Sequence, residues 1–385
     1  MSNFIPLSVP WIKGNEWKYV KECLDSEWVS SAGKFVDRFE QDICHFTGAR
    51  FAIACVNGTS ALQIGLRIAG VRPGDAVIVP TLTFIAPVNV VRYFYADPIF
   101  MDCDYYYNLD TEKTKGFILN STYYKNGSTF DKATGKRIAA IIPVHIFGNA
   151  VNLDPLIDIC LERNIKVVED ATESLGTIYT EGRFAKRHTG TIGEIGCLSF
   201  NGNKIITSGG GGMILTDNPS VAELAKYLTT QAKDDELRYI HNETGYNFRL
   251  SNIQAALGVA QLENIQEFLQ IKKRNYILYK TFLEGIPGLH LADVPDYARN
   301  NYWMYALQIQ QKIYGRDRDQ LMQDLFTHNI QTRPVWHLNH LQKPYKDCPK
   351  YKIEKALGLL ERTLNLPCSV GLNESDIRRI IDLLA

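Results

Sequence analysis

The chain has 385 residues, 45% of them hydrophobic, so it can bury a large core and exceeds the usual size of a single domain. Its 42 basic residues match its 42 acidic residues, and no extended basic block is present, which argues against a nucleic-acid partner. No stretch of eighteen consecutive apolar residues occurs, so we do not expect a helix that spans a membrane.

Short apolar runs rich in Val, Ile and Phe alternate with helical patterns between about residues 51 and 217. This alternation is typical of crossover units that build a largely parallel sheet with helices on its faces, so we predict an α/β domain. The expected strands are 51–56, 76–79, 99–101, 138–144, 166–168, 196–200 and 213–215, and the expected helices are 60–69, 85–94 and 154–163.

A long helical pattern at 251–284 follows, with Ser251 as the predicted N-cap and Gly285 just past its end. We expect this helix to bridge two domains. Beyond it the sequence predicts a strand at 304–309, a helix at 317–326, a strand at 330–335 and a closing helix at 374–384 that begins after Asn373.

The domain boundary is expected within the bridging helix. We predict a large α/β domain over 1–265, whose first 30 residues pack near the small domain, and a smaller α+β domain over 266–385. Within the long helical pattern, the basic run Lys272-Lys273-Arg274 is interpreted as a solvated helix face without a function.

The eight cysteines are scattered, none in a CxxC pair, and several lie inside apolar runs. This usage fits buried free thiols in a reducing compartment. The first 13 residues lack a basic region followed by an apolar stretch, so no export signal is expected. We therefore predict a cytoplasmic protein, and we expect no metal site.

A turn with the sequence Asn57-Gly58-Thr59-Ser60 joins a predicted strand to a predicted helix. Such a turn brings backbone amides, the positive end of a helix dipole and two hydroxyls together, which suits a phosphate group. A plain N-cap explains the same residues, because Thr and Ser often take that position. No G-x-G-x-x-G follows a strand, which argues against a dinucleotide site.

Carboxylates follow the predicted strand 166–168, in the run Glu169-Asp170-Ala171-Thr172-Glu173. The carboxyl ends of parallel strands form the edge where open α/β folds bind ligands. An Asp at this edge can pair with a pyridinium nitrogen and keep the ring protonated, which is what pyridoxal phosphate (PLP) chemistry requires. A capping Asp is the alternative interpretation.

Lys204 lies between the predicted strand 196–200 and the glycine-rich turn 209–212. A single lysine in a loop is usually a solvated charge. Here, however, a carboxylate and a candidate phosphate site precede it in the order that a PLP site requires. A lysine whose pKa is lowered by its surroundings can form a Schiff base with the cofactor and then move a proton.

Six motifs in this order resemble those of the DegT/DnrJ/EryC1/StrS family of sugar aminotransferases, and the resemblance runs over essentially the whole chain. The motifs are Asn57-Gly58-Thr59-Ser60-Ala61-Leu62, Pro80-Thr81-Leu82-Thr83-Phe84, Pro143-Val144-His145-Ile146-Phe147-Gly148, Glu169-Asp170-Ala171, Ser199-Phe200 with Lys204, and Tyr246-Asn247-Phe248-Arg249. The resemblance implies the PLP-dependent aminotransferase fold of type I.

The resemblance also implies roles for single residues. Lys204 would hold the cofactor as an imine, Asp170 would pair with its pyridinium nitrogen, and Phe84 would stack on its ring. The residues that would hold its phosphate are Gly58, Thr59, Ser60 and Ser199. Asn247 would reach the phosphate of the neighbouring subunit's cofactor, so the active site would be shared across a homodimer. The alternative role for Asn247 is that of a turn residue.

Glu173 departs from many relatives, which carry His or Gln near the ring hydroxyl three residues after the aspartate. A glutamate at this cofactor-binding position needs a proton or a different partner. The run 169–174 is similar to the branch that makes legionaminic acid and bacillosamine precursors. The resemblance therefore implies a UDP- or GDP-linked 4-keto-6-deoxy-N-acetylglucosamine as the substrate.

Substrate residues are expected in the small domain, where the segment 332–341 is similar to the family segment that closes over the sugar nucleotide. His340 and Arg333 are the candidates, although structural histidines outnumber those that bind ligands. The aromatic-rich segment 28–33 is expected to line the same entrance.

The implied reaction moves an amino group from L-glutamate to the 4-keto carbon of the sugar, with pyridoxamine phosphate and 2-oxoglutarate formed on the way. Its product would serve lipopolysaccharide, other surface glycans or nonulosonic acid precursors. Two alternatives remain. Sugar dehydratases of the same family carry His in place of the imine lysine, so Lys204 argues against that reaction. Intact Lys204, Asp170 and phosphate-site residues argue against a catalytically idle nucleotide-sugar binding protein.

Overall fold

The computed structural model describes residues 4–235 and 237–385. Its main sheet has eight strands in the order β1-β10-β9-β7-β6-β2-β3-β15. The strands are β1 (Phe51–Cys55), β2 (Ala76–Pro80), β3 (Asp97–Met101), β6 (Ile138–Ile141), β7 (Lys166–Asp170), β9 (Ile195–Ser199), β10 (Gly212–Thr216) and β15 (Lys350–Tyr351). Only β10 runs antiparallel to its neighbours. The predicted α/β class with a mostly parallel sheet is confirmed.

Helices cover this sheet, which explains why every residue of β2 and β6 is buried and why both strands are almost wholly apolar. Three helices were predicted close to their observed bounds, namely α3 (Gly58–Ile68), α4 (Ala86–Tyr93) and α6 (Asp154–Glu162). Before residue 251, the elements that were not predicted are α1 (Glu16–Asp25), α2 (Lys34–Thr47), α5 (Thr111–Ser121), β4 (Thr122–Lys125), β5 (Ser128–Asp131), η1 (Ile146–Gly148), β8 (Ile178–Tyr179) and α7 (Pro219–Thr229).

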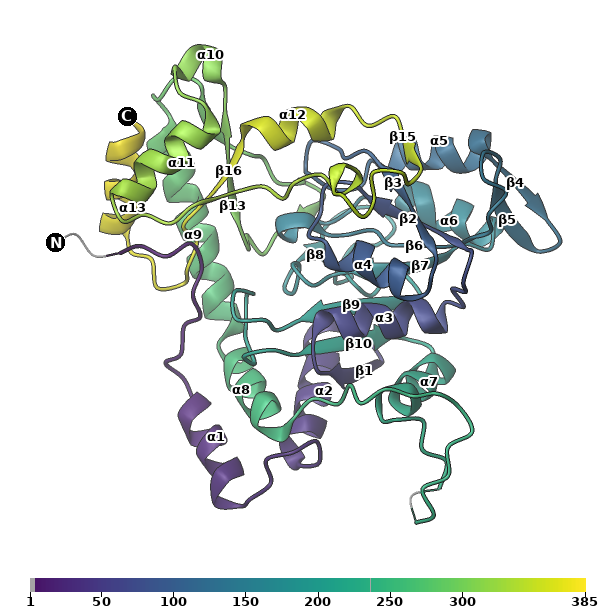
Figure 1. Cartoon of the computed structure of the whole chain (residues 1–385). Coiled ribbons are helices and arrows are strands. Elements are labelled where there is room, and N and C mark those ends of the chain that lie inside the picture. The colour runs from purple at the N-terminus through teal and green to yellow at the C-terminus, as the bar shows by residue number, and fades with distance from the viewer. Residues whose placement is uncertain (1–3, 236) are drawn as a thin grey trace.

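The predicted single helix at 251–284 is two helices, α8 (Asn252–Glu263) and α9 (Ile265–Leu283). Ser251 caps α8 as predicted, in a reciprocal capping box with Gln254. The break lies at Asn264, whose side chain donates to the Ala260 carbonyl oxygen at 3.0 Å. Figure 1 shows α9 continuing from α8 toward the smaller sheet, while α1 and α2 lie beside α8.

The smaller sheet has the order β11-β13-β16-β14. Its strands are β11 (Leu289–Leu291), β13 (Tyr305–Ile309), β14 (Arg333–Pro334) and β16 (Thr363–Leu366). The helices of this part of the chain are α10 (Gln311–Tyr314), α11 (Arg318–Thr327), η2 (Asn339–Leu341), α12 (Lys355–Arg362) and α13 (Glu374–Leu384). The short strand β12 (Ala298–Arg299) pairs with β8 instead. The predicted strand 330–335 is paired in this sheet only over β14, and β11 and β16 were not predicted. Asn373 caps α13 as predicted.

Segments far apart in the sequence join the two sheets. Ile5 forms a bridge with Ile330 and belongs to the apolar cluster of the small sheet, and Figure 1 shows the N-terminal segment descending beside α9 to α1. In the other direction, β15 adds to the β3 edge of the large sheet. The boundary predicted near residue 265 stays a prediction.

The interpretation of the basic run on α9 as a solvated face is wrong for Lys272, which is only 2% exposed. Its Nζ donates to the carbonyl oxygens of Trp303 at 3.1 Å and Cys368 at 2.6 Å, so backbone acceptors compensate the buried ammonium group. All eight cysteines are free. Among the residues that the structure describes, no helix combines the length and apolarity that a membrane span needs, and no group of at least three His, Cys, Asp or Glu side chains gathers as a metal site requires.

Candidate active site

A cavity of about 290 Å³ lies where β7 and β9 end and α3 begins. We call it the Lys204 cavity. The predicted site residues that line it are Gly58, Thr59, Phe84, Asp170, Glu173, Ser199 and Lys204. Adjacent parallel strands bring their carboxyl ends to one edge of the sheet, which explains how three separate sequence motifs meet here.

One end of the cavity is the N-terminus of α3. Asn57, and not Thr or Ser, caps this helix, because its Oδ1 accepts the Ser60 amide at 2.8 Å. A Cβ atom on Gly58 would lie only 2.9 Å from Ser199 Cβ and 3.1 Å from Thr172 Cγ2, so glycine lets the helix end approach Ser199. The result is an end rich in amides and hydroxyls that favours an anion such as phosphate.

Asp170 supplies a buried carboxylate from the last position of β7. Burial raises its pKa, while the Thr172 amide, which donates to Oδ1 at 3.1 Å, acts in the opposite direction. A carboxylate held in such a site is stabilised by a cation, and a protonated ring nitrogen is a cation of this kind.

Lys204 lies between Glu173 and an indole ring. Its Nζ is 3.8 Å from Glu173 Oε1 and 4.0 Å from the centre of the Trp303 ring. Burial lowers the pKa of Lys204, although Glu173 and Asp170 oppose this effect. A lysine with a lowered pKa supplies more of the neutral amine, which is the nucleophilic form.

Glu173 is buried and has two contacts. Its Oε2 accepts the Phe147 amide at 2.8 Å, while Oε1 faces Lys204. Burial raises the pKa of Glu173 to about 7, against the opposing effects of Lys204 and the Phe147 amide. A glutamate at this cofactor-binding position was expected to need a proton or a different partner, and a carboxyl group with this pKa is partly protonated near neutral pH.

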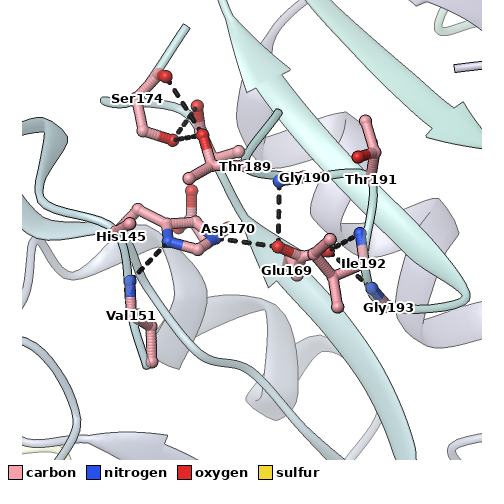
Figure 2. Close-up of polar contacts among 12 residues, drawn as sticks. His145, Val151, Glu169, Asp170, Ser174, Thr189, Gly190, Thr191, Ile192 and Gly193 are labelled. Atoms are coloured by element: carbon pink, nitrogen blue, oxygen red, sulfur yellow. Dashed lines mark hydrogen bonds and ion pairs between the residues drawn. The ribbon is translucent and has the colours of Figure 1, made fainter. Parts of the chain in front are cut away.

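A second buried carboxylate, Glu169, fixes the structure behind Asp170 (Figure 2). Three backbone amides donate to its carboxylate, those of Gly190, Ile192 and Gly193, at 2.9, 2.6 and 2.6 Å. His145 Nε2 lies 2.9 Å from Glu169, and His145 Nδ1 accepts the Val151 amide at 3.0 Å, so Nε2 carries the hydrogen. Burial raises the pKa of Glu169, but the hydrogen bonds outweigh it and lower the value overall. This network ties β7 to the segment that presents the Phe147 amide to Glu173.

Two tryptophans line the cavity wall: Trp303, which was not predicted, and Trp336, which lies in the segment 332–341 that was expected near the sugar nucleotide. Trp303 Nε1 donates to the Asn203 carbonyl oxygen at 2.6 Å, which fixes the residue that precedes Lys204. The Trp336 ring stacks on Phe147 at 5.2 Å and meets Phe84 edge-on at 6.5 Å. Both come from the part of the chain beyond α9, and no sequence motif marks Trp303 as a neighbour of Lys204.

The remaining predicted residues lie outside this cavity. Arg333 lines an adjoining pocket, described below. His340 is 5% exposed and its Nδ1 lies 2.6 Å from Thr81 Oγ1, which supports a packing role, so substrate binding by it stays a prediction. Asn247 is exposed and bridges to Thr230, and the segment 28–33 borders a separate pocket beside Asn252.

The chemical groups that line the cavity fit PLP, and one buried hydroxyl there has no partner in the described part of the chain. It offers an anion site, a carboxylate, a lysine amine and an aromatic side chain within one enclosure. In addition, Thr83 lines the cavity, and within residues 4–235 and 237–385 its buried Oγ1 has no hydrogen-bond partner. A polar ligand group at this position would satisfy that hydroxyl.

Comparison with known proteins gives one consistent result. The DegT/DnrJ/EryC1/StrS aminotransferase family matches residues 10–385. GDP-perosamine synthase of Caulobacter vibrioides is 37% identical over 99% of this chain and 97% of its own length. The putative pyridoxal phosphate-dependent aminotransferase EpsN of Bacillus subtilis is 32% identical over 100% of this chain and 96% of its own. The crystal structure of DesI in the presence of its TDP-sugar product superposes with a TM-score of 0.88 at 26% identity, covering 100% of this chain and 93% of DesI.

Proposed function

The chain belongs to the DegT/DnrJ/EryC1/StrS aminotransferase family, and we propose that it transfers an amino group from L-glutamate to the 4-keto carbon of a nucleotide-linked 4-keto-6-deoxy sugar. The enzyme is a PLP-dependent sugar aminotransferase. The observation that carries the proposal is the meeting of Lys204, Asp170 and the N-terminus of α3 in one cavity.

Each part of PLP has a matching group in the cofactor site. Gly58, Thr59 and Ser199 would hold the phosphate, with Ser60 in the same turn, while Asp170 would face the ring nitrogen and Lys204 the aldehyde carbon. When bound, PLP would supply an aldehyde carbon that can carry the amino group and a ring that can accept electrons.

The protein's own groups hold and move the protons. The Lys204 Nζ, with a lowered pKa, takes the proton from the α carbon of the amino acid and later returns one to the sugar carbon. Glu173 can hold a proton beside that nitrogen, because burial raises its pKa to about 7. Trp303 and Trp336 give this side of the cavity an aromatic wall.

For the acceptor, we propose a GDP-linked sugar. Support comes from the GDP-perosamine synthase of C. vibrioides, the relative at 37% identity. The UDP- or GDP-linked N-acetyl sugar implied by Glu173 is the alternative. Arg333 is exposed beside the cavity wall, and its guanidinium suits the nucleotide's phosphates.

We further propose a homodimer in which Asn247 reaches the phosphate site of the partner subunit. Its exposed position within the single chain is consistent with that role. The cytoplasmic location stays a prediction from the sequence.

The proposed function is tested by two half-reactions. The purified holoenzyme should be yellow, and L-glutamate alone should remove the visible absorption band and yield 2-oxoglutarate. A panel of GDP- and UDP-linked 4-keto-6-deoxy sugars should then restore the band, and mass spectrometry should detect a 4-amino sugar nucleotide. A product that has lost a hydroxyl group instead indicates a dehydratase, and sugar binding without any spectral change indicates an idle binding protein.

A stability measurement tests the Glu173 assignment. Because the folded-state pKa of Glu173 lies near 7 and its ordinary value is 4.5, the unfolded chain loses this proton first as the pH rises. Glu173 therefore costs no stability below about pH 4.5, and its cost grows between pH 4.5 and 7 to a few kcal/mol, on the order of 1.4 kcal/mol per pKa unit. In the apoprotein, Glu173→Gln should thus gain unfolding free energy relative to wild type as the pH rises through this window.

The control for this measurement is Glu284→Gln, which alters an exposed glutamate just after α9. Its unfolding free energy should follow that of wild type between pH 5 and 8. A constant difference between Glu173→Gln and wild type across this range contradicts a proton held at Glu173.

A further inference from the structure

A second pocket, of about 370 Å³, adjoins the Lys204 cavity. The two share Asn203, Trp303 and Trp336 in their walls. We call it the Asn365 pocket, after the buried polar residue that also lines it. A molecule whose reacting carbon approaches Lys204 can therefore extend past the two tryptophans into this space.

Asn365 lies in the centre of the small sheet. It belongs to β16, where it is paired with Ala306 of β13 on one side and Arg333 of β14 on the other. Its neighbours Leu364 and Leu366 belong to the apolar cluster of the small sheet. Because side chains alternate along a strand, Asn365 points to the opposite face, and the two flanking strands hold it there rigidly.

The amide of Asn365 is buried without a partner. The side chain is 5% exposed, and its Oδ1 has no hydrogen-bond partner among the residues that the structure describes. Burying an unsatisfied amide oxygen is unfavourable, so such groups usually bond to a ligand or to water. A hydroxyl group can donate to this oxygen or accept from the amide nitrogen.

The rest of the pocket limits what such a ligand can be. Trp336 and Phe147 stack at 5.2 Å with an angle of 30° between their rings, which presents an aromatic surface. Arg333, at the same pocket, is exposed and carries a positive charge. An aromatic wall, a hydroxyl-binding amide and a guanidinium together suit a sugar ring attached to phosphate.

We propose that Asn365 is a specificity-determining residue whose side-chain amide hydrogen-bonds one ring hydroxyl of the keto-sugar. The proposal rests on the proposed function. It adds the position of the sugar ring and the hydroxyl group that the enzyme recognises. Because Asn365 is unpaired until the sugar binds, an analogue without that hydroxyl leaves the amide unsatisfied and is rejected.

The test compares wild type with Asn365→Leu on three amino acceptors: GDP-4-keto-6-deoxy-D-mannose and its analogues that lack the 2-hydroxyl or the 3-hydroxyl. If the sugar panel identifies a different nucleotide sugar as the better acceptor, that sugar and its deoxy analogues replace them. In wild type, one of the two analogues should show a kcat/KM about tenfold to a hundredfold lower than the full sugar. In Asn365→Leu this difference should disappear, because the full sugar falls to the level of that analogue.

Two further variants keep the result interpretable. Asn365→Asp retains an acceptor oxygen and should retain part of the discrimination, even if the leucine variant folds poorly. Gln308 lies on the same sheet but lines another cavity, and its side chain donates to the Tyr107 hydroxyl at 3.0 Å. The Gln308→Leu variant should therefore leave the discrimination unchanged. The proposal is overturned if wild type treats all three sugars alike, or if folded Asn365 variants keep the wild-type discrimination. If glutamate removes the absorption band but no keto-sugar restores it, the proposed acceptor class is itself wrong and this proposal fails with it.

Discussion

Lys204→Ala is expected to lose transamination by at least about a thousandfold in kcat, since the variant lacks both the attacking amine and the group that moves the proton. Lys204 is partly buried beside Glu173 and Trp303, and among the described residues that line the cavity it is the one lysine. The rate of 2-oxoglutarate formation from L-glutamate measures the first half-reaction, and the rate of amino-sugar formation measures the second. An added small alkylamine should restore part of the rate, because it replaces the missing base.

Two controls separate covalent chemistry from charge. Lys204→Arg keeps a cation between Glu173 and Asp170 but lacks a nucleophilic amine, so it should be as inactive as the alanine variant. Borohydride reduction of the wild-type holoenzyme, followed by peptide mapping, should find the cofactor on the peptide that contains Lys204. An alanine variant that aminates the sugar at the normal rate, or a cofactor attached elsewhere, removes the basis of the proposed function.

Much of the cavity was predictable because its residues follow strands of one parallel sheet. Asp170 ends β7 and Ser199 ends β9, and these strands are neighbours, so two motifs about thirty positions apart in sequence meet at the same edge. The turn before α3 reaches the same edge. Apolar runs identified the strands, and the short motifs after each run identified the chemistry.

The residues contributed by the small sheet could not be predicted in the same way. Trp303 precedes β13 and Trp336 follows β14, so both are placed by the small sheet, while Asn365 belongs to β16, a strand that was not predicted at all. An asparagine within an apolar strand gives no local sign that its amide is unsatisfied. That property depends on every neighbour that the fold brings near it.

Errors in the helices have local causes. α2 begins after Gly33, which has a φ of 152° and makes no side-chain cap, and α1 also lacks a side-chain cap, so the usual start signals are missing. The break at Asn264 interrupts a pattern that remains apolar on both sides. Lys272 looked solvated because its hydrogen-bond acceptors are backbone carbonyls, which the identity of nearby residues does not reveal.

Asp170→Asn is expected to lower kcat/KM for both half-reactions by a factor on the order of a hundred to ten thousand. The change keeps the shape of the side chain and its contact with Thr172, but it removes the charge that we propose holds a proton on the ring nitrogen. Without that proton the ring is a poorer acceptor of electrons, so deprotonation of the α carbon slows. The cofactor should still bind, since the phosphate site at α3 is intact, and its absorption band should decay slowly after L-glutamate is added.

Asp104→Asn provides the matched control for the loss of a carboxylate. Burial raises the pKa of Asp104 to about 7, as burial also raises that of Asp170, but Asp104 lines a different cavity and accepts the amides of Tyr106 and Asn108. This variant should keep wild-type kinetics in both half-reactions. If Asp170→Asn instead stays within about threefold of wild type, Asp170 does not control the ring nitrogen. If Asp104→Asn is impaired as strongly as Asp170→Asn, the loss reflects a general effect of neutralising an acid whose pKa burial raises, and the assignment of Asp170 to the ring is contradicted.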